Sequence, residues 1–488
     1  MNSNAIAVAK GDGIGPEIMD AVIRIFDAAG VPLRYDHIDM GKSVFDKGYS
    51  TGMTDEAMKT VEEAGVLFKG PMETPKGTGV KSINVTARKL WNTYANVRIF
   101  RTIEGVDTIF SKAGIPINIT LLRENIEDTY GGIEYMHTPD VAISYRLVTR
   151  PGTEQFVRFA FDYAKRHNIS KITCGHKANI MKLTDGLFMN EFYKMAKEYP
   201  EIEVEDVIVD ALAMRLVNHP EWYEMIILTN LQGDILSDLC AGLVGGLGFA
   251  PSANVGDYIS IFEAVHGTAP DIAGKGMANP TSLLLSGLMM LRHVGLLSQA
   301  DNIENALFYS LEQGVHTGDF GSPGTPKLST QGFADAIIGN LGKKPERTRP
   351  ADAKKENFNY TRQKGPQEMR MLEESNNKST RFVGMDIFIE SDASPDDIAA
   401  KVRKGLQGRL ELTLISNRGT QVWPESSRFT DSVAHYCLRF EQAVNHKPLT
   451  HTELLALSQK VAEKFTIADI VFLHEFNGER GYSLAQGQ

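Results

Sequence analysis

Strand-like and helical stretches alternate along the first 340 or so residues, and this alternation restricts the fold more than any other feature of the sequence. Residues 5–30, AIAVAKGDGIGPEIMDAVIRIFDAAG, form an apolar run, a glycine loop and an amphipathic stretch. Pro16 suits the first turn of a helix and Gly30 its C-terminal end. Further strand-like runs lie at 65–70, 117–125, 141–150, 170–176, 204–211 and 223–230, and helical patterns at 152–167 and 282–295. We therefore expect an α/β protein with a substantially parallel sheet.

The composition changes after about residue 342. The stretch 343–382 has many charges and almost no aliphatic residues, which predicts an exposed linker. The apolar pattern then returns in the order β-α-β, a further strand, and α-β, which indicates a C-terminal α+β domain over 383–488, of ferredoxin-like type. Ser394 and Thr450 are the expected N-caps of its two helices. No catalytic constellation is visible in this part of the sequence.

The overall composition is that of a globular protein and excludes several classes. The 488 residues exceed one typical core, so two or three domains are expected. The net charge of −10 disfavours nucleic acid as a partner. No run of 18 apolar residues and no signal-peptide pattern occur, so we expect a cytoplasmic protein with no membrane partner. Three cysteines without a short spacing argue against a disulfide framework and a structural zinc site.

Two motifs in the first third of the chain carry polar residues suited to ligands. GDGIGPEI (11–18) is either a tight strand-to-helix turn or a direct cofactor contact, and the motif alone does not decide. VKSINVTARK (80–89) supplies Ser82, Asn84 and Arg88, and Arg98 and Arg123 follow. Three arginines and two small polar groups can clamp a molecule with several carboxylates, because the planar guanidinium binds carboxylates bidentately. Each arginine alone is equally consistent with a solvated surface.

The middle of the chain supplies an acidic set and a lysine. Asp234 and Asp238 are four residues apart, so a helix starting near 234 places both on one face. Asp210 ends a strand-like run. Oxygen ligands of this kind suit Mg²⁺ or Mn²⁺, although an N-cap aspartate beside an exposed one fits as well. Lys177 follows a strand and a glycine and is either a catalytic ammonium or a loop lysine.

Seven motifs together resemble the isocitrate and isopropylmalate dehydrogenase family, in the family's order and over roughly residues 5–340. They are GDGIGPE, KGPMETP, SINVTARK, RENIEDTYGGIE, KANIMK, NLQGDILSD and HGTAPDIAGKGMANP. The resemblance implies a non-Rossmann fold with a large domain (1–93 and 245–342), a small domain (94–244) and clasp strands near 131–150. It also implies a homodimer with shared active sites. The C-terminal part resembles the extension of some bacterial isocitrate dehydrogenases, and we expect it to strengthen the dimer or build higher oligomers, with effector binding as the rival role.

The resemblance implies the oxidative decarboxylation of isocitrate to 2-oxoglutarate and CO₂, a reaction of the tricarboxylic acid cycle. Ser82 and Asn84 favour isocitrate over homoisocitrate and isopropylmalate, because isopropylmalate enzymes are apolar on this helix. A non-catalytic regulatory subunit is the other alternative, and the complete catalytic set argues against it. The implied roles are carboxylate binding by Arg88, Arg98 and Arg123, proton donation by Tyr130, hydroxyl deprotonation by Lys177, metal binding by Asp210, Asp234 and Asp238, and nicotinamide and substrate contacts by Lys69 and Thr74. Lys177 and Asp210 come from the partner subunit in this family.

The loop HGTAPDIAGKGMANP (266–280) is implied to hold the cofactor's adenosine, through His266, Gly267 and Asn279. Relatives that use NADP carry Lys-Tyr after HGTAP, where this chain has Asp271 and Ile272. It also has His219 where those relatives offer an arginine. A carboxylate accepts hydrogen bonds from ribose hydroxyls and repels a 2′-phosphate. The sequence therefore predicts NAD as the cofactor.

Overall fold

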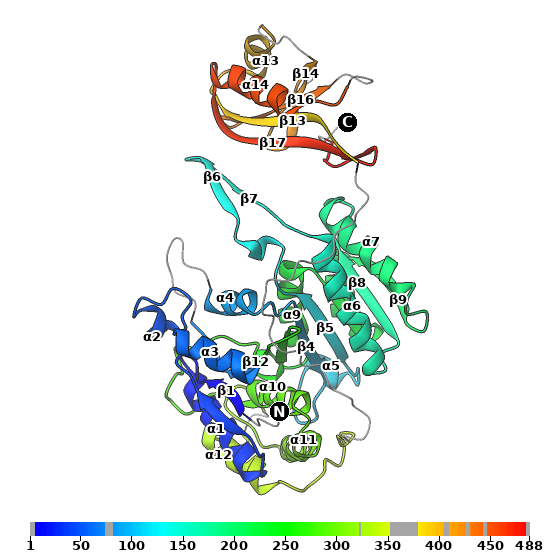
Figure 1. Ribbon diagram of the computed structural model, residues 1–488. Coiled ribbons are helices and arrows are strands. Elements are labelled where there is room, and N and C mark those ends of the chain that lie inside the picture. Colours follow the sequence, from blue (N-terminus) through cyan, green and yellow to red (C-terminus); the bar gives the residue numbers. More distant parts are fainter. Residues whose placement is uncertain are drawn as a thin grey trace. The chain divides into compact units, whose positions relative to one another are not determined.

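The computed structural model describes residues 5–73, 82–321, 324–351, 379–404, 409–424, 430–442 and 447–484. The chain divides into two compact units (Figure 1). The first takes residues 1–131, 147–180 and 185–372, and the second takes 132–146, 181–184 and 373–488, each as far as it is described. Each unit has its own sheet and its own apolar core.

A ten-stranded sheet organises the first unit, in the order β2-β1-β3-β12-β11-β4-β5-β10-β8-β9. Its strands are β1 (Ala5–Ala9), β2 (Arg34–His37), β3 (Val66–Lys69), β4 (Ala95–Arg101), β5 (Asn118–Glu124), β8 (Lys171–His176), β9 (Glu203–Ile208), β10 (Met225–Leu228), β11 (Pro251–Val255) and β12 (Ser260–Ala264). The predicted parallel pairing is confirmed on both flanks. In the centre, β12-β11, β11-β4 and β4-β5 are antiparallel. The turn between β11 and β12 is too short for a parallel crossover.

Helices cover both faces of this sheet, because neighbouring side chains on each strand point to opposite faces. Leu122 of β5 joins the core under one set of helices, and Leu121 joins the core under the other. The first set is α1 (Gly15–Ala28), α6 (Arg150–Arg166), α7 (Thr184–Ala196), α10 (Thr281–His293), α11 (Leu297–Glu312) and α12 (Thr330–Gly339). The second is α3 (Asp55–Ala64), α4 (Ile83–Leu90), α8 (Val209–Asn218) and α9 (Asn230–Leu243). Short elements complete the unit: α2 (Lys42–Phe45), α5 (Ile109–Lys112), η1 (Thr129–Gly131), η2 (Pro220–Trp222) and η3 (Leu247–Phe249).

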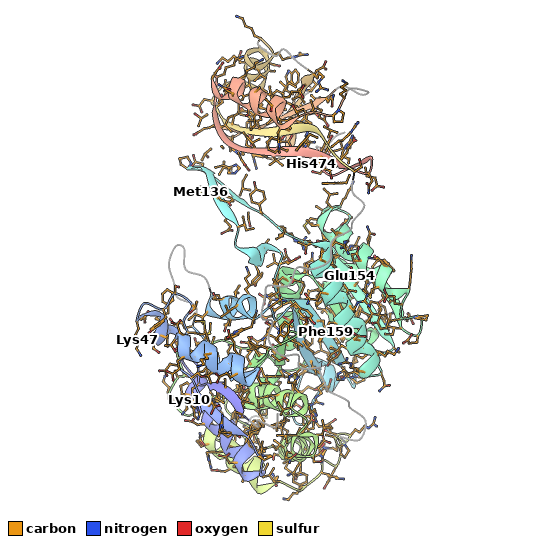
Figure 2. The ribbon with its side chains drawn as sticks, viewed as in Figure 1. Lys10, Lys47, Met136, Glu154, Phe159 and His474 are labelled. Atoms are coloured by element: carbon orange, nitrogen blue, oxygen red, sulfur yellow. The ribbon has the colours of Figure 1, made fainter. Side chains whose placement is uncertain are left out.

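Helix α6 illustrates how the sequence sets these elements. Thr149 caps it by accepting a 3.1 Å hydrogen bond from the Gly152 amide, so the helix begins just before the predicted range and shortens the strand expected over 141–150. Arg150 pairs with Glu154 at 2.7 Å on its outer side. Phe159, also on α6 (Figure 2), meets the ring of Tyr94 edge-on with centroids 6.0 Å apart.

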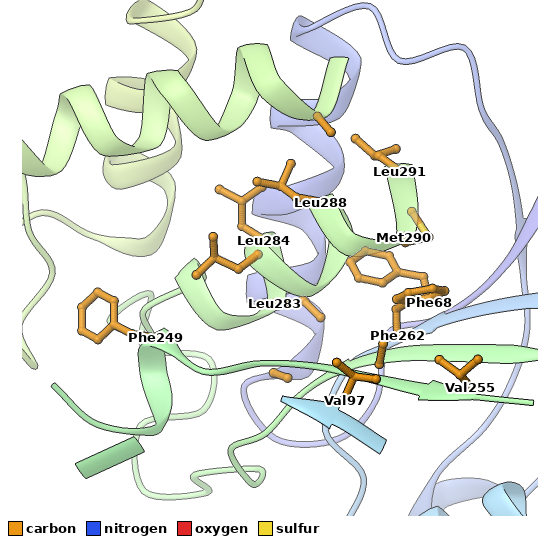
Figure 3. Close-up of a cluster of buried hydrophobic side chains, with 14 of the residues drawn as sticks. Phe68, Val97, Phe249, Val255, Phe262, Leu283, Leu284, Leu288, Met290 and Leu291 are labelled. Carbon is orange, nitrogen blue, oxygen red and sulfur yellow. The ribbon is translucent and has the colours of Figure 1, made fainter. Parts of the chain in front are cut away.

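The largest core lies between α10 and the sheet. Phe68 of β3, Val97 of β4 and Phe262 of β12 belong to one buried cluster with Leu284 and Leu288 of α10 (Figure 3). Burying a large apolar side chain contributes about 1.5–3 kcal/mol, so this cluster fixes the strand order around β3 and β12. The sheet's two halves come from the chain stretches predicted for the large and small domains, and the boundary between those domains stays a prediction.

The second unit contains a six-stranded antiparallel sheet in the order β15-β14-β16-β13-β17-β18. Its elements are β13 (Thr380–Glu390), α13 (Pro395–Arg403), β14 (Leu410–Asn417), β15 (Thr420–Trp423), β16 (His435–Gln442), α14 (His451–Ala462), β17 (Thr466–Phe476) and β18 (Glu479–Arg480). The four main strands follow the ferredoxin-like order, which confirms the predicted α+β fold. Ser394 and Thr450 accept the predicted capping bonds of α13 and α14, and both helices pack on one face of the sheet.

Two further findings concern the predicted linker and clasp strands. Most of the linker lies outside the described residues. The part that is described is bound to the first unit, because the carboxylate of Glu312 accepts hydrogen bonds from the backbone amides of residues 346–348.

The strands expected near 131–150 are present as a two-stranded antiparallel hairpin, β6 (Glu134–Thr138) and β7 (Val141–Ser144), and they belong to the second unit.

Candidate active site

Three arginines converge on the face of the sheet that α9 covers. Arg98 on β4 and Arg123 on β5 lie on neighbouring strands, and Arg88 lies in the last turn of α4. Arg98 and Arg123 are 4% and 1% exposed, so these two are not solvated surface arginines. Burial, with the charges of Arg123 and Arg88, lowers the pKa of Arg98 to about 10. Buried guanidinium groups crowded in this way favour an anion between them.

The protein's own acceptors satisfy the arginines only in part. Arg123 donates through Nε and Nη2 to Oδ1 of Asn230, at 2.9 and 2.7 Å, and pairs with Asp234. Arg98 lies 3.9 Å from Asp234 and 3.7 Å from Asp238. The buried Nε of Arg88 has no partner among the groups that the structure describes. An incoming carboxylate can supply the missing acceptor.

Asp234 and Asp238 lie one turn apart on α9, as the spacing predicts, although the helix begins earlier, at Asn230. Burial acts to raise the pKa of Asp234, but the charge of Arg123 and the hydrogen bond from Tyr130 hold it below its usual value. Burial raises the pKa of Asp238, and the charge of Asp234 adds to this effect against the charge of Arg98. Two carboxylates one turn apart repel each other unless a cation lies between them. The pair therefore fits a hard divalent cation.

Tyr130 lies in the short helix η1 and contacts both Asp234 and Arg123. Its hydroxyl donates a 2.7 Å hydrogen bond to Asp234, and the guanidinium of Arg123 lies 4.7 Å from the centre of its ring. Burial and this hydrogen bond raise the pKa of Tyr130, while the charge of Arg123 lowers it. The tyrosine is therefore protonated at neutral pH.

Glu263, which sequence reasoning missed, joins two predicted site residues, Lys69 and Arg88, in one buried group. Glu263 on β12 pairs with Lys69 on β3 and accepts a 2.9 Å hydrogen bond from Arg88. Lys69 and Arg88 thus share the carboxylate of Glu263, and both Lys69 and Glu263 are almost fully buried. The sequence does offer a signal, because Glu263 is the one acidic residue in the apolar strand SIFEA, just before the loop at 266. An acidic residue in a buried strand requires a partner.

The predicted polar pair lies at the start of α4. Ser82 is the residue before the helix, and its side chain does not cap it. Asn84 accepts a 2.8 Å hydrogen bond from Nζ of Lys69, which joins the pair to the buried group around Glu263. Thr74 lies outside the described residues.

Lys177 and Asp210 form a second group. They pair with each other, and the backbone amide of Lys177 donates a 2.6 Å hydrogen bond to Asp185. Asp210 lies in the first turn of α8 and not at the end of a strand, because β9 ends at Ile208. The hydrogen bond from Lys177 lowers the pKa of Asp210. The structure thus brings these two residues together. Neither of them takes part in the hydrogen bonds that join Arg123, Tyr130 and Asp234.

The loop 266–280 is anchored to the N-terminal glycine motif. The Ile14 amide donates a 2.9 Å hydrogen bond to the carbonyl oxygen of Thr268, and a Cβ on Gly13 would lie 2.1 Å from that same oxygen. Glu17 of α1 accepts bonds of 3.1 and 3.2 Å from the amides of Gly276 and Ala278. The motif GDGIGPEI therefore acts as a tight turn that holds the loop, which favours the first of its two interpretations.

The residues predicted to hold adenosine lie in this loop. Nδ1 of His266 lies 3.0 Å from the Gly267 carbonyl oxygen, and its buried Nε2 has no partner among the described groups. Burial lowers the pKa of His266, so the ring is neutral at pH 7 and can accept or donate one hydrogen bond. Asn279 donates a 3.0 Å hydrogen bond to Asp319. An orphaned buried ring nitrogen fits an adenosine that would complete its hydrogen bonding.

The three residues taken as cofactor selectors are placed differently from one another. Asp271 is exposed at the turn, whereas Ile272 packs against the main core of the first unit. His219 stacks on Trp222 with ring centroids 4.0 Å apart and approaches Glu221 at 3.2 Å. Ile272 and His219 are thus already engaged by the protein.

The described residues contain neither a complete metal site within one chain nor a membrane-spanning helix. Within one chain, no group of three or more histidine, cysteine, aspartate or glutamate side chains in the described ranges is arranged to hold a metal ion. None of the helices described is long and apolar enough to cross a bilayer.

Comparisons with known proteins agree with this arrangement. The model of the isocitrate/isopropylmalate dehydrogenase family matches residues 5–337, and the model of the bacterial isocitrate dehydrogenase C-terminal domain matches 380–488. An isocitrate dehydrogenase of Thermus thermophilus, named for NADP, is 44% identical over 99% of this chain and 96% of its own. One from Rickettsia bellii, also named for NADP, is 42% identical over 99% of both chains. A crystal structure of a Thermus thermophilus protein covers 99% of this chain and 96% of its own, with 43% identity and a TM-score of 0.91.

The prediction of NAD is wrong. Both of these full-length relatives are named for NADP, whereas a relative from Drosophila melanogaster named for NAD matches only 69% of this chain. The physical reason lies in the exposure of Asp271. Two charges 4 Å apart repel by roughly 4 kcal/mol near a protein surface but only about 1 kcal/mol in water, and salt screens the remainder. A solvated carboxylate is therefore a weak barrier to a 2′-phosphate.

Proposed function

Because the chain belongs to the isocitrate/isopropylmalate dehydrogenase family, we propose that it oxidises and decarboxylates isocitrate to 2-oxoglutarate and CO₂ with NADP⁺ as the hydride acceptor. The observation that carries the proposal is the group of buried arginines facing Asp234, Asp238 and Tyr130. Arg88, Arg98, Arg123 and Lys69 exceed the carboxylates of Asp234, Asp238 and Glu263 by one positive charge. A site with this balance attracts an anion that carries several carboxylates.

The residues of the chain divide the work in the following way. Arg88, Arg98 and Arg123 bind and orient two of the substrate's carboxylates, and Ser82 and Asn84 hold the third. Lys177 of a second copy of the chain takes part in removing the proton from the substrate's hydroxyl, directly or through water. Tyr130 donates a proton to the carbon that loses CO₂.

A divalent cation and NADP⁺ complete the chemistry. Asp234 and Asp238, joined by Asp210 of a second copy of the chain, would hold Mg²⁺ or Mn²⁺, which supplies a Lewis acid for the substrate's oxygens. His266, Gly267 and Asn279 would hold the adenosine half of NADP⁺, which supplies the hydride acceptor. Both donor sets fit, since one contains a pair of carboxylates that repel each other and the other an orphaned buried nitrogen.

The active unit is a homodimer. The support is indirect: Lys177 and Asp210 pair with each other within the chain, outside the hydrogen bonds of the arginine group. A second copy can bring its own Lys177 and Asp210 to this group. A role in the tricarboxylic acid cycle follows from the same family membership, and a cytoplasmic location follows from the sequence pattern; both stay predictions.

Steady-state kinetics on the purified chain test the proposal. With Mn²⁺ present, we expect isocitrate to be turned over without any other protein, and kcat/KM to be higher with NADP⁺ than with NAD⁺. Homoisocitrate and 3-isopropylmalate should be at least about 100-fold poorer. 3-Isopropylmalate offers Ser82 and Asn84 no carboxylate, and homoisocitrate carries its third carboxylate one methylene further out. A preference for either of these acids overturns the choice of substrate. Inactivity until a different chain is added supports a regulatory subunit instead.

A further inference from the structure

The hairpin β6–β7, which we name the arm (residues 132–146), has two unlike faces. Tyr135 pairs with Ile143 on one face, and the ring of Tyr145 meets that of Tyr135 edge-on with centroids 5.9 Å apart. The other face carries the pairs Met136–Ala142 and Glu134–Ser144, and residues on both faces are exposed, Tyr135 at 56%. Met136, near the tip of the arm (Figure 2), is 64% exposed. A two-stranded ribbon of this size has little stability of its own and needs a surface to lie against.

That surface is the sheet of the C-terminal domain. The register of the arm shifts between Met136 and Thr138, so His137 is the extra residue of a bulge. A bulge re-aims a side chain, and here the imidazole is only 4% exposed. It lies 3.2 Å from Nε2 of His435 on β16 and 3.6 Å from Asp469 on β17, and it meets the ring of Phe388 with centroids 5.7 Å apart.

A second contact fixes the base of the arm. The hydroxyl of Tyr145 donates a 2.5 Å hydrogen bond to the same carboxylate, Asp469. This bond is the largest cause of a pKa of about 12 for Tyr145, so the tyrosine stays a donor over the whole physiological range. One residue of the domain, Asp469, therefore holds two different side chains of the arm.

The face that receives the arm is the one that the domain's helices leave uncovered. Met385, Ile387 and Ile389 of β13 point into the core beneath α13 and α14. Phe388 points the other way, and its ring stacks with that of His435 at 5.6 Å. None of the residues to which the proposed reaction assigns a role lies in the described part of this domain.

We infer that the C-terminal domain binds the arm and fixes its position. Its helix-free sheet face seats His137 and Tyr145, keeps the hairpin ordered, and so presents Met136 and its neighbours to a second copy of the chain. The part that concerns a second copy rests on the homodimer proposed above. The seating of the arm does not, because every contact that supports it lies within one chain.

Hydrogen exchange of the full-length protein, read by mass spectrometry on peptides covering 132–146, tests the seating. Tyr145→Phe removes the bond to Asp469. His137→Ala removes the imidazole that lies against His435, Asp469 and Phe388. Tyr482→Phe is the matched control, because it removes a bond of similar length from Tyr482 to Glu441 in the same domain. We expect exchange in the arm to rise at least about threefold in Tyr145→Phe and further in His137→Ala, with no change in the control.

Sedimentation equilibrium on the same proteins tests the consequence for assembly. We expect the dissociation constant between copies to rise in Tyr145→Phe and His137→Ala and to stay unchanged in Tyr482→Phe. Unchanged exchange in both arm variants, or equal effects in the control, overturns the inference. Faster exchange with unchanged association keeps the seat and overturns its role in assembly. A wild-type chain that is monomeric at all concentrations refutes the homodimer, while the exchange data still decide the seating.

Discussion

Glu263 pairs with Lys69 in the interior of the protein, where the two side chains are 5% and 1% exposed. The charges of Lys69 and Arg88 hold the pKa of Glu263 well below its usual range despite burial. Glu263→Gln leaves the ammonium of Lys69 without a counter-charge, and we expect the free energy of unfolding to fall by roughly 3–5 kcal/mol in urea denaturation. The control is Glu198→Gln, which breaks the exposed 2.9 Å pair with Arg158. Its effect on stability should be much smaller, because water solvates and screens both partners of this exposed pair. Equal losses in the two variants would contradict the argument.

Tyr130→Phe tests the proton donor. The substitution keeps the ring near Arg123 and removes only the hydroxyl, so we expect kcat to fall roughly 10²–10⁴-fold with little change in the KM for isocitrate. Tyr199→Phe serves as the control, because the hydroxyl of Tyr199 donates a 2.8 Å bond to Asp162 elsewhere on the first unit. A kcat that stays near the wild-type value in Tyr130→Phe excludes the tyrosine as the acid.

Removal of divalent cations tests the acidic pair. We expect a chelator to abolish turnover and Mn²⁺ to restore it. Asp238→Asn is the cleaner variant, since Asp234 also binds Arg123 and Tyr130. The concentration of Mn²⁺ that gives half-maximal activity should rise at least about tenfold in Asp238→Asn. Asp162→Asn, at a distance from these contacts, should leave it unchanged. Full activity in excess chelator would refute the metal site.

Glu124 makes stability depend on pH. Its carboxylate accepts bonds of 2.8 and 3.1 Å from the amides of Ile126 and Glu127, yet burial raises its pKa from 4.5 to about 7. The folded chain thus keeps a proton that the unfolded chain releases, so stability is lost as pH rises from about 4.5 to 7. The loss amounts to roughly 3 kcal/mol. Glu124→Gln should flatten this slope in urea titrations across that range. If the variant shows the same slope, groups other than Glu124 cause the pH dependence of stability.

Asp271→Asn tests the corrected view of the cofactor loop. Because the carboxylate is exposed, its removal should change the KM for NADP⁺ by less than about threefold. A tenfold gain in affinity for NADP⁺, with none for NAD⁺, would show that the carboxylate does repel the 2′-phosphate.

The residues that the sequence placed well are those whose position follows from local spacing. Asp234 and Asp238 lie on one helix because they are four residues apart. Ser394 and Thr450 cap helices because their side chains bond to amides three residues further along the chain. The order of strands and helices in both units follows from the same short-range patterns.

Other features of the fold and the site could not be predicted, because they depend on contacts between distant parts of the chain. Glu263 could not be matched with Lys69, because the two lie on strands far apart in sequence that become neighbours only in the folded sheet. The antiparallel pairing of β11 with β4 has the same cause, whereas β11 and β12 are neighbours in the sequence. The cofactor was mispredicted because the charge of Asp271 was considered without its exposure, which no sequence pattern reports.

The pairing of β3 with β12 also bears on how the protein is made. Phe68 faces Phe262 across these strands, so the first three strands complete their side of the sheet only with a segment that is synthesised much later. A nascent chain that ends near residue 240 therefore carries unpaired strand edges and uncovered apolar side chains. Ribosome-bound chains of that length should be cut readily by protease and should recruit chaperones, whereas chains extended beyond α10 should resist cleavage.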